Sequence, residues 1–368
     1  MGISLKSFEY SKFNFNIIDV PGRRDFIEET ITGTSQADVG LLVVDASKGN
    51  YEVGIDDNGQ TREHCLLAYT LGVKQLVVAI NKMDDETVNF SEDRWKTIRG
   101  EIATYLKKVG YKPMKIPFIP ISGWQGDNLN SKSFHMPWYG GSTLLEALNN
   151  VTAPKRPIDK PLRIPIQDVR NIEGIGTVLV GRVESGVLKP GLNIQLAPPG
   201  TLGIIQSLQI NFQIVARAIP GDIVSINIKD GWNGVVNTHP GQVLSNYDDR
   251  PAQEVSSFEA QIIIMNHPGK ISNGYTAVID CHTSHTPCTF VNIKEKLDKR
   301  TGKILVQNPN NVQTGDVCIV KVEPKSPLCL EQFNDFPYLG RFCVRDLGGI
   351  VAIGVVKTVI HGDTKAES

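Results

Sequence analysis

Hydrophobic and polar positions divide the chain into two parts with different periodicities. In the first part, continuous apolar runs at 39–44 and 75–80 alternate with segments in which apolar residues recur every three or four positions. Continuous runs indicate strands buried on both faces, and the longer spacing indicates amphipathic helices. After Val151 the helical spacing nearly disappears, and short apolar segments separated by Gly and Pro follow one another. The pattern predicts a parallel α/β sheet followed by all-β domains.

The first part is predicted to open with a hairpin and to continue with alternating helices and strands. Prolines within the run at 116–121 place that strand toward an edge of the sheet. We expect Ser142 to cap the N-terminus of the last helix. The expected strands are 4–8, 13–18, 39–44, 75–80 and 116–121, and the expected helices are 25–32, 61–71, 92–109 and 142–149.

Two linkers divide the chain into three predicted domains, 1–153, 161–247 and 252–362. The first linker, 153–161, is rich in proline, and the second, 248–251, ends in one. Each of the last two domains contains short strands separated by turn residues, as in a small β-barrel. The expected strands are 163–169, 176–183, 192–196, 204–210 and 222–228, then 257–265, 276–281, 286–293, 317–322, 341–344 and 349–360.

The composition is that of a nearly neutral protein with several cores and no disulfide framework. With 368 residues and 40% hydrophobic composition, the chain can bury two or three cores. The formal net charge is −1, so nucleic-acid binding would need a local basic patch. Six scattered cysteines indicate free thiols in a reducing compartment. No charged-then-apolar leader begins at Met1 and no apolar run reaches about eighteen residues, so we expect a cytoplasmic protein that does not enter membranes.

The first candidate motif is Asp19-Val20-Pro21-Gly22, which follows a predicted strand. P-loop GTPases use Asp-x-x-Gly at the end of a strand to place a carboxylate near Mg²⁺ and a backbone N–H near the γ-phosphate. Alone the motif is weak, because many strand-to-turn junctions carry Asp and Gly.

A second motif, Asn81-Lys82-Met83-Asp84, directly follows the apolar run at 75–80. In such a motif the aspartate accepts hydrogen bonds from guanine N1–H and the exocyclic amine, the lysine stem covers the ring, and the asparagine joins neighbouring loops. Adenine presents the opposite pattern and would leave the carboxylate unpaired, at a cost of about 1–3 kcal/mol. The alternative is a solvated polar turn after a strand.

A third segment, Ser122-Gly123-Trp124, follows the apolar run at 118–121. A Ser-Gly turn at this place would present a backbone N–H to the guanine carbonyl. By itself the segment is a weak signal, and it gains weight from its order after the other two motifs.

These motifs, in this order, resemble those of the elongation factor one-alpha family of translation GTPases. The resemblance implies a P-loop GTPase-type parallel sheet followed by two β-barrels, and GTP-dependent delivery of aminoacyl-tRNA to the ribosomal A site. The implied partners are aminoacyl-tRNA, the ribosome, a nucleotide-exchange factor and actin, for a protein that acts as a monomer. The resemblance covers nearly the whole chain and is carried by 19–26, 32–38, 59–64, 81–84, 121–124, 161–169, 176–184, 280–283 and 339–342.

The resemblance also implies a site for GTP or GDP with Mg²⁺. Asp19 would hold Mg²⁺ through a water molecule, and Gly22 would contact the γ-phosphate. Arg23 stands where the family has a histidine that orients the attacking water. Because a guanidinium has donors only, we expect impaired GTP hydrolysis. The residues that would contact the guanine are Asn81, Lys82, Asp84, Ser122, Gly123 and Trp124.

The phosphate-loop pattern Gly-x-x-x-x-Gly-Lys-Ser/Thr does not occur in the sequence. By resemblance, Met1 aligns just after the family's first switch, so the first strand, phosphate loop, first helix and first switch lack counterparts. We therefore expect weak or absent GTP binding by this chain alone, and Mg²⁺ at Asp19 only if the missing segment is supplied. The missing strand would lie between the strand ending at Asp19 and the strand at 39–44, so two edges would lose their partners. The gap allows two interpretations: an incomplete sequence, or a short protein whose gap is filled otherwise.

Three further segments allow two interpretations each. Phe212 lies where the family has Met-His-His-Glu beside the acceptor end of tRNA, and it would either stack on a base or pack into the barrel. The basic residues between 294 and 303 form either a solvated loop or a phosphate contact. Cysteines and histidines between 281 and 288 have zinc-like spacing, but a strand turns them to opposite faces, which favours ordinary barrel packing.

Two other functions stay open from the sequence. A degenerate, non-enzymatic paralogue would bind tRNA, actin or a translation factor without turnover. A termination or ribosome-rescue GTPase would share the fold and bind a protein mimic of tRNA. The turn at 126–128 and the segment 280–283 favour the elongation branch.

Overall fold

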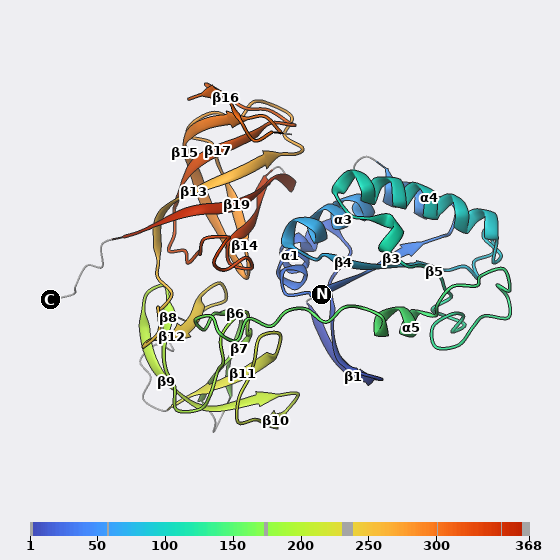
Figure 1. Cartoon of the computed structure of the whole chain (residues 1–368), viewed down its shortest axis with the longest axis horizontal. Helices are drawn as coiled ribbons and strands as arrows, with labels where there is room; N and C mark the ends of the chain where they lie inside the picture. Colours follow the sequence, from blue (N-terminus) through green and yellow to red (C-terminus); the bar gives the residue numbers. More distant parts are fainter. Residues whose placement is uncertain are drawn as a thin grey trace. The chain divides into compact units, whose positions relative to one another are not determined.

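The computed structural model describes residues 3–56, 59–172, 176–229, 238–299, 301–346 and 348–362, with Arg24 described by its backbone only. The chain forms two compact units, Met1–Pro154 and Lys155–Ser368 (Figure 1). The boundary between them lies in the proline-rich linker at 153–161. The first unit is α/β and the second is all-β, which confirms the fold class predicted from the hydrophobic pattern.

The first unit contains a hairpin, a three-stranded parallel sheet and the helices that pack on this sheet. Its elements are β1 (Ser4–Tyr10), β2 (Phe13–Asp19), the 3-10 turn η1 (Arg24–Phe26), α1 (Ile27–Ser35), β3 (Val39–Asp45), α2 (Asn50–Ile55), α3 (Gln60–Leu71), β4 (Gln75–Asn81), α4 (Glu92–Val109), η2 (Pro113–Lys115), β5 (Phe118–Pro120) and α5 (Leu144–Asn149). The parallel sheet has the order β3-β4-β5, with β5 at an edge as expected. Helices α3 and α4 cover one face and α5 covers the opposite face (Figure 1).

The central strand β4 is buried on both faces. Val78 packs with Ile98 of α4 in one core, and its neighbour Val77 packs with Ala147 of α5 in another. Because alternate residues of a strand point to opposite faces, a strand covered on both sides needs an uninterrupted apolar run. The run at 75–80 therefore predicts a central strand. The polar motif Asn81–Asp84 begins at the last residue of this strand, so it lies at the carboxyl edge of the sheet.

The hairpin β1–β2 is a sheet of its own and does not pair with β3. Helix α1 packs against the end of β2, where a Cβ added at Gly33 would lie 2.3 Å from Val20 Cγ1. One edge of β3 has no strand partner among the described residues. On the face of β3 that α4 does not cover, Leu41 and Val43 are 43% and 55% exposed. Strand β3 thus has the sequence of a buried strand and the position of an edge strand.

The predicted cap of α5 is wrong by one residue. Thr143, rather than Ser142, is the N-cap. Thr143 Oγ1 accepts a hydrogen bond from the Glu146 N–H at 3.3 Å, and Glu146 Oε2 accepts one from the Thr143 N–H at 2.8 Å. This reciprocal capping box needs a glutamate three residues after the cap, and Ser142 has Leu145 there instead.

The second unit consists of two closed β-barrels. The first closes in the order β9-β11-β7-β6-β12-β8 with β8 pairing back to β9, and the second in the order β14-β18-β19-β13-β17-β15 with β15 pairing back to β14. Strands β10 and β16 each extend one barrel by a single edge pairing. The first barrel contains β6 (Ile164–Ile172), β7 (Gly176–Arg182), β8 (Asn193–Ala197), β9 (Thr201–Ile210), β10 (Gln213–Ile214), β11 (Ile223–Ile228) and β12 (Val243–Asn246), and the second contains β13 (Val255–Ile264), β14 (Thr276–Cys281), β15 (Ser284–Leu297), β16 (Ile304–Gln307), β17 (Val317–Pro324), β18 (Arg341–Asp346) and β19 (Gly349–His361).

The two barrels share a buried ion pair beside a small apolar cluster. Arg163 Nη2 lies 2.7 Å from Glu331 Oε1, and the two side chains are 2% and 11% exposed. The guanidinium carbon of Arg163 also lies 4.7 Å from the ring centroid of Phe336. The buried apolar residues of the cluster are Ala197, Val243, Ala252, Cys329, Phe336 and Leu339. A charge removed from water requires its partner, so this pair ties the first barrel to the second.

The segment with zinc-like spacing is a hairpin with its own polar partners. Nδ1 of His285 lies 2.8 Å from Asp280 Oδ1, and Arg345 Nε donates to Asp280 Oδ2 at 3.0 Å. At the turn between β14 and β15, His282 has a φ of 45° and its Nε2 lies 3.0 Å from the Cys329 carbonyl oxygen. The described residues include no group of three or more His, Cys, Asp or Glu side chains arranged to hold a metal ion.

The buried His282 predicts loss of stability in mild acid. The pKa of this imidazole is lowered from 6.5 to about 4, mainly by burial and in addition by the nearby His285, while the hydrogen bond with the Cys329 carbonyl acts in the opposite direction. The unfolded chain therefore binds a proton at higher pH than the folded chain does, and the stabilising contribution present above pH 6.5 is lost as the pH falls toward 4. We expect the free energy of unfolding to fall by about 3 kcal/mol over this window from this group.

Urea titrations of the parent and of His282→Asn between these pH values measure the effect. Asparagine accepts a positive φ and does not titrate, so the variant is expected to lose most of this slope. An equal slope in both proteins would assign the acid sensitivity to other groups.

Candidate functional site

The carboxyl ends of the parallel strands bring the sequence motifs together at one edge of the sheet. Strand β3 ends at Asp45, β4 ends at Asn81, and β5 ends at Pro120 just before the turn at 122–127. Open parallel sheets bind ligands outside this edge, because the loops that follow each strand meet there. The candidate site therefore consists of three loops from segments that are separated in the sequence.

Asn81 joins two of these loops. Its side-chain Oδ1 accepts a hydrogen bond from the Gly123 N–H at 2.8 Å, and its backbone carbonyl accepts one from Ala46 N–H at 2.9 Å. A Cβ at Gly123 would lie 3.3 Å from Asn81 Oδ1, so a larger residue would have to displace the amide. The asparagine thus acts in this structure as the tie that the sequence motif suggests.

Asp84 has an unmet hydrogen-bonding capacity. Its Oδ1 is buried and has no hydrogen-bond partner among the described residues. A buried carboxylate oxygen without a donor costs about 1–3 kcal/mol, so such an atom calls for a ligand or water that donates to it. Guanine carries two adjacent donors, N1–H and the exocyclic amine, and fits this requirement.

Lys82 is held in place by a residue that the sequence motifs did not single out. Its Nζ lies 2.6 Å from Asp45 Oδ2, and its backbone has a φ of 62°. The hydrogen bond to Asp45 raises the pKa of the Lys82 ammonium. Burial acts to raise the pKa of Asp45, but the hydrogen bonds from Lys82 and Ser47 outweigh it and lower this pKa. The pair anchors the ammonium group of Lys82 at the end of β3.

The turn at 122–127 uses several of its backbone donors in hydrogen bonds with its own residues or with Asn81. Ser122 is buried, and its Oγ accepts a hydrogen bond from the Gln125 N–H at 3.0 Å. The Ser122 N–H donates to the Asp127 carbonyl at 3.3 Å, and the Gly123 N–H is taken by Asn81. The Trp124 N–H has no partner within the described part of the chain, and the Trp124 side chain is 91% exposed. Trp124 therefore has an N–H that is not used inside this turn.

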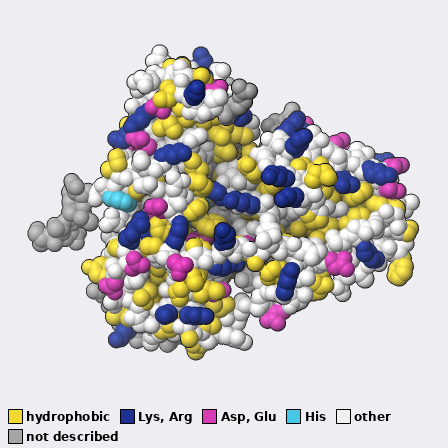
Figure 2. All heavy atoms as spheres, viewed as in Figure 1, with side chains coloured by type: hydrophobic (Ala, Val, Ile, Leu, Met, Phe, Trp, Pro, Cys, Tyr) yellow, Lys and Arg dark blue, Asp and Glu magenta, His cyan; other side chains and the backbone are white. Residues whose placement is uncertain are grey.

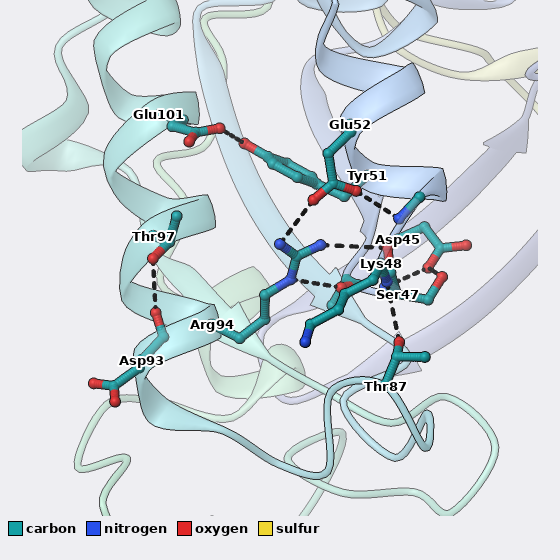
Figure 3. A network of polar contacts seen from close by, with 12 residues as sticks. Asp45, Ser47, Lys48, Tyr51, Glu52, Thr87, Asp93, Arg94, Thr97 and Glu101 are labelled. Carbon is teal, nitrogen blue, oxygen red and sulfur yellow. Dashed lines mark hydrogen bonds and ion pairs between the residues drawn. The ribbon is translucent and has the colours of Figure 1, made fainter.

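Arg94 of α4 fixes the loop that follows β3 (Figure 3). Its Nε donates to the Ala46 carbonyl at 2.9 Å, its Nη2 donates to the Ser47 carbonyl at 3.3 Å, and its Nη1 lies 2.9 Å from Glu52 Oε1. Glu52 in turn accepts a hydrogen bond from the Gly49 N–H at 2.7 Å. The Arg94 side chain thereby donates to two backbone carbonyls of the loop that directly follows Asp45.

Removing Arg94 is expected to loosen this loop. We expect Arg94→Ala to lower the free energy of unfolding of the first unit by about 2 kcal/mol, because two carbonyls lose their donor and Glu52 loses its partner. Amide hydrogen exchange at 46–52 should accelerate. Lys96→Ala is the matched control, since Lys96 on the same helix pairs with Glu92 in the open, with the two side chains 57% and 42% exposed. Equal exchange in both variants would contradict the role of Arg94.

The residues predicted to contact phosphate and Mg²⁺ lie on the separate hairpin. Asp19 is the exposed last residue of β2, and a Cβ added at Gly22 would meet no atom within 4 Å. Arg23 Nη2 lies 3.0 Å from Asp25 Oδ2, in a pair whose side chains are 78% and 70% exposed. The turn after Asp19 is fixed by Thr30 Oγ1, which donates to the Pro21 carbonyl at 2.8 Å. The structure thus brings Asn81, Lys82, Asp84 and the turn at 122–124 together after β4 and β5, whereas Asp19 ends β2 of the hairpin sheet and Gly22 and Arg23 follow it in the turn.

The structure bears on two predicted partner surfaces. Phe212, at the turn between β9 and β10, is 99% exposed, so of the two interpretations left open for it, packing into the barrel is wrong. In the basic segment, Lys294 pairs with Glu259, and Lys296 Nζ lies 2.9 Å from Asp316 Oδ1. Arg300 lies outside the described residues. Basic and acidic side chains also intermingle on the face shown in Figure 2 rather than forming a field of one sign.

Comparison with known proteins identifies the family. The model of the elongation factor Tu GTP binding domain matches residues 1–154, and the model named GTP-eEF1A C-terminal domain-like matches residues 257–357. Elongation factor 1-alpha of Tetrahymena pyriformis is 53% identical over 361 residues, which cover 98% of this chain and 82% of that protein. The chain belongs to the elongation factor 1-alpha family.

Other relatives support this assignment. Elongation factor 1-alpha of Entamoeba histolytica is 53% identical over 358 residues, which cover 97% of this chain and 80% of that protein. Among solved structures, apo translation elongation factor SelB from Methanococcus maripaludis has a TM-score of 0.72 at 21% identity, covering 96% of this chain and 72% of that one, and supports the fold. The structure of sup35 complexed with GMPPNP has a TM-score of 0.52 at 32% identity, covering 96% and 84%. This chain is thus a member of a family of translation elongation GTPases, with a guanine-nucleotide-binding domain at its N-terminal end.

Sequence reasoning missed Asp45 and Arg94 because neither belongs to a local motif. Asp45 is 37 residues from Lys82, and Arg94 is 48 residues from Ala46. The one available signal for Asp45 was a charged residue at the end of an otherwise apolar strand, next to the predicted binding edge.

Proposed function

We propose that this chain recognises guanine nucleotides through the loops after β3, β4 and β5, as a translation elongation factor does. The observation that carries the proposal is the buried, unpartnered Oδ1 of Asp84 beside the Asn81–Gly123 tie. Asp84 would accept from the base edge, the stem of Lys82 would cover the ring, and the Trp124 N–H would donate to the guanine carbonyl. Ser122 stabilises the turn and would not contact the base through its side chain, since its hydroxyl oxygen accepts a hydrogen bond from the Gln125 N–H.

The phosphate end of the nucleotide is held less completely in this proposal. Asp19 would supply one water-mediated contact to Mg²⁺, and the described residues provide no cluster of three acidic or other metal-binding side chains around it. When bound, Mg²⁺ neutralises phosphate charge. We therefore propose weak binding of GTP and GDP by these 368 residues, and impaired hydrolysis because Arg23 cannot accept a hydrogen bond from water.

A competition experiment tests both halves of the proposal. Mant-GDP is titrated into the 368-residue chain with Mg²⁺, and GDP, guanosine and ADP compete. We expect guanosine to compete within about tenfold of GDP, and ADP to compete at least about 100-fold more weakly, because the base carries most of the recognition. Nanomolar binding of GTP with Mg²⁺ would contradict the proposal that the chain recognises the guanine base but holds the phosphates weakly. Equal competition by ADP and GDP would contradict the proposed guanine site.

Membership of the elongation factor 1-alpha family implies that the chain interacts with aminoacyl-tRNA and the ribosome. Relatives named elongation factor 1-alpha match nearly the whole chain at about half identity, which favours elongation over the termination or rescue alternative. We propose further that the chain acts as a cytoplasmic monomer, and that a nucleotide-exchange factor and actin are among its partners. In the part of the chain that the structure describes, no helix combines the length and apolarity needed to cross a membrane. We also propose that the domains are 1–153, 161–247 and 252–362.

A further inference from the structure

Strand β16 lies at one end of the second barrel (Figure 1) and carries three consecutive apolar residues that are exposed. The side chains of Ile304, Leu305 and Val306 are 49%, 58% and 46% exposed. The strand pairs with β15 on one side only, so its other edge has no strand partner among the described residues. Edge strands of natural proteins usually carry charges or proline, because a free apolar edge is a template for another strand. The four residues of β16, Ile304–Gln307, include neither a charged residue nor a proline.

Hydrogen bonds of Asp298 hold the described residues of the turn before β16, which carries Lys299 and Lys303. Asp298 closes it, since its Oδ1 accepts from the Thr301 N–H at 2.6 Å and its backbone N–H donates to the Lys303 carbonyl at 2.8 Å. The exposed ammonium groups of Lys299 and Lys303 have no ion-pair partner within the described segments. An incoming segment that runs along β16 would therefore meet positive charge at the strand's beginning and apolar side chains along its length.

The same features disfavour a nucleic-acid backbone as the occupant. Lys294 and Lys296, on the adjoining strand, are already paired with Glu259 and Asp316. A phosphate backbone would use two lysines and leave three apolar side chains in contact with water or sugar. A peptide strand would satisfy the free backbone edge and cover the apolar side chains together.

We propose that β16 is a docking strand for an extended segment of another protein, apolar over three or four residues and acidic where it meets Lys299 and Lys303. The segment adds as a further strand to the free edge of β16. Main-chain hydrogen bonds supply the pairing, the apolar side chains supply contact area, and the lysines select the acidic end.

Fluorescence anisotropy with the full chain and a labelled peptide, Gly-Asp-Glu-Val-Thr-Val-Ile-Thr-Gly, tests this proposal. We expect saturable binding, and Leu305→Glu should weaken it about tenfold or more by placing a charge on the apolar edge. A peptide of the same sequence that is N-methylated along one edge keeps its side chains but cannot complete the ladder, and it should bind about tenfold more weakly or not at all.

A second set of variants tests the role of charge in peptide binding. The double variant Lys299→Glu/Lys303→Glu should weaken binding of the acidic peptide, and a peptide with two lysines in place of Asp-Glu should bind this variant in its place. Lys357→Glu is the matched control, because Lys357 is an exposed lysine on β19 and β19 is separated from β16 by β13, β17 and β15 in the sheet. It should leave the affinity unchanged within about twofold, and circular dichroism confirms that each variant is folded.

Three results would overturn the proposal. The first is no binding up to about 1 mM peptide, which is the limit of useful affinity. The second is competition by a poly-uridine oligonucleotide that depends on Lys299 and Lys303, which would make the lysines a phosphate contact. The third is concentration-dependent self-association abolished by Leu305→Glu, which would make a second copy the occupant. None of these results depends on whether the chain binds guanine nucleotides.

Discussion

Arg163→Ala is expected to lower the free energy of unfolding of the second unit by about 3–5 kcal/mol, because it leaves Glu331 buried without a partner. The Arg163 side chain is 2% exposed and both its Nε and its Nη2 lie 2.7 Å from Glu331 Oε1. The desolvation cost of the glutamate persists after the arginine has gone, and that cost exceeds what an exposed pair is worth. Urea denaturation followed by circular dichroism measures the loss.

Two further variants separate this explanation from simple loss of contact area. Arg163→Met with Glu331→Leu removes both charges and should recover most of the loss, since the pair is replaced by apolar side chains. Arg170→Ala breaks an exposed pair with Asp168, whose side chains are 64% and 42% exposed for arginine and aspartate, and should cost less than about 1 kcal/mol. If Arg163→Ala cost no more than Arg170→Ala, the ion pair would not be what joins the barrels.

Asp84→Asn is expected to weaken GDP binding about 100-fold or more, because two charge-assisted hydrogen bonds to the guanine edge are lost. An amide placed there turns its NH₂ toward the base. Xanthine carries a carbonyl where guanine carries the exocyclic amine, so the same variant should bind xanthosine diphosphate more tightly than the parent does. Competition against mant-GDP in the parent, and direct nucleotide titration in the variant, measure both affinities.

Asp85→Asn is the control for this exchange of specificity. Asp85 lies next to Asp84 in sequence, but its carboxylate is used by Thr87, whose N–H and Oγ1 both donate to Asp85 Oδ1. We expect its effect on the ratio of the two nucleotides to stay within about twofold. A parallel loss of both nucleotides in Asp84→Asn would indicate damage to the loop instead of a change in base recognition.

Local patterns explain which elements were predicted correctly. The run at 75–80 and the motif that follows it are contiguous, so strand β4 and the position of Asn81 at its end follow from neighbouring residues. Helix α4 was found because its buried residues Trp95, Ile98, Ile102 and Leu106 recur at helical spacing. The helix α2 was missed, since six residues with one buried side chain, Tyr51, give no periodic signal.

Short edge and closing strands were missed for a related reason. Strand β12 has four residues and closes the first barrel by pairing with β6 and β8, both distant in sequence. Strand β16 also has four residues, all exposed, so it shows no alternation between a buried and a solvated face. In each case the strand is defined by its partners more than by its own residues.

The sequence by itself determined the order of the elements, the change from α/β to β-barrels and the position of the Asn81–Asp84 motif directly after a buried strand, because each depends on residues within a few positions of one another. Only the tertiary structure decided that Asp45 holds Lys82, that Arg94 fixes the loop directly after Asp45, and that Arg163 joins the barrels through Glu331, 168 residues away. The chain offers 38 basic and 39 acidic residues, and nothing local distinguishes the few pairs that folding buries. Burial depends on which surfaces meet, and that is settled by the packing of whole elements.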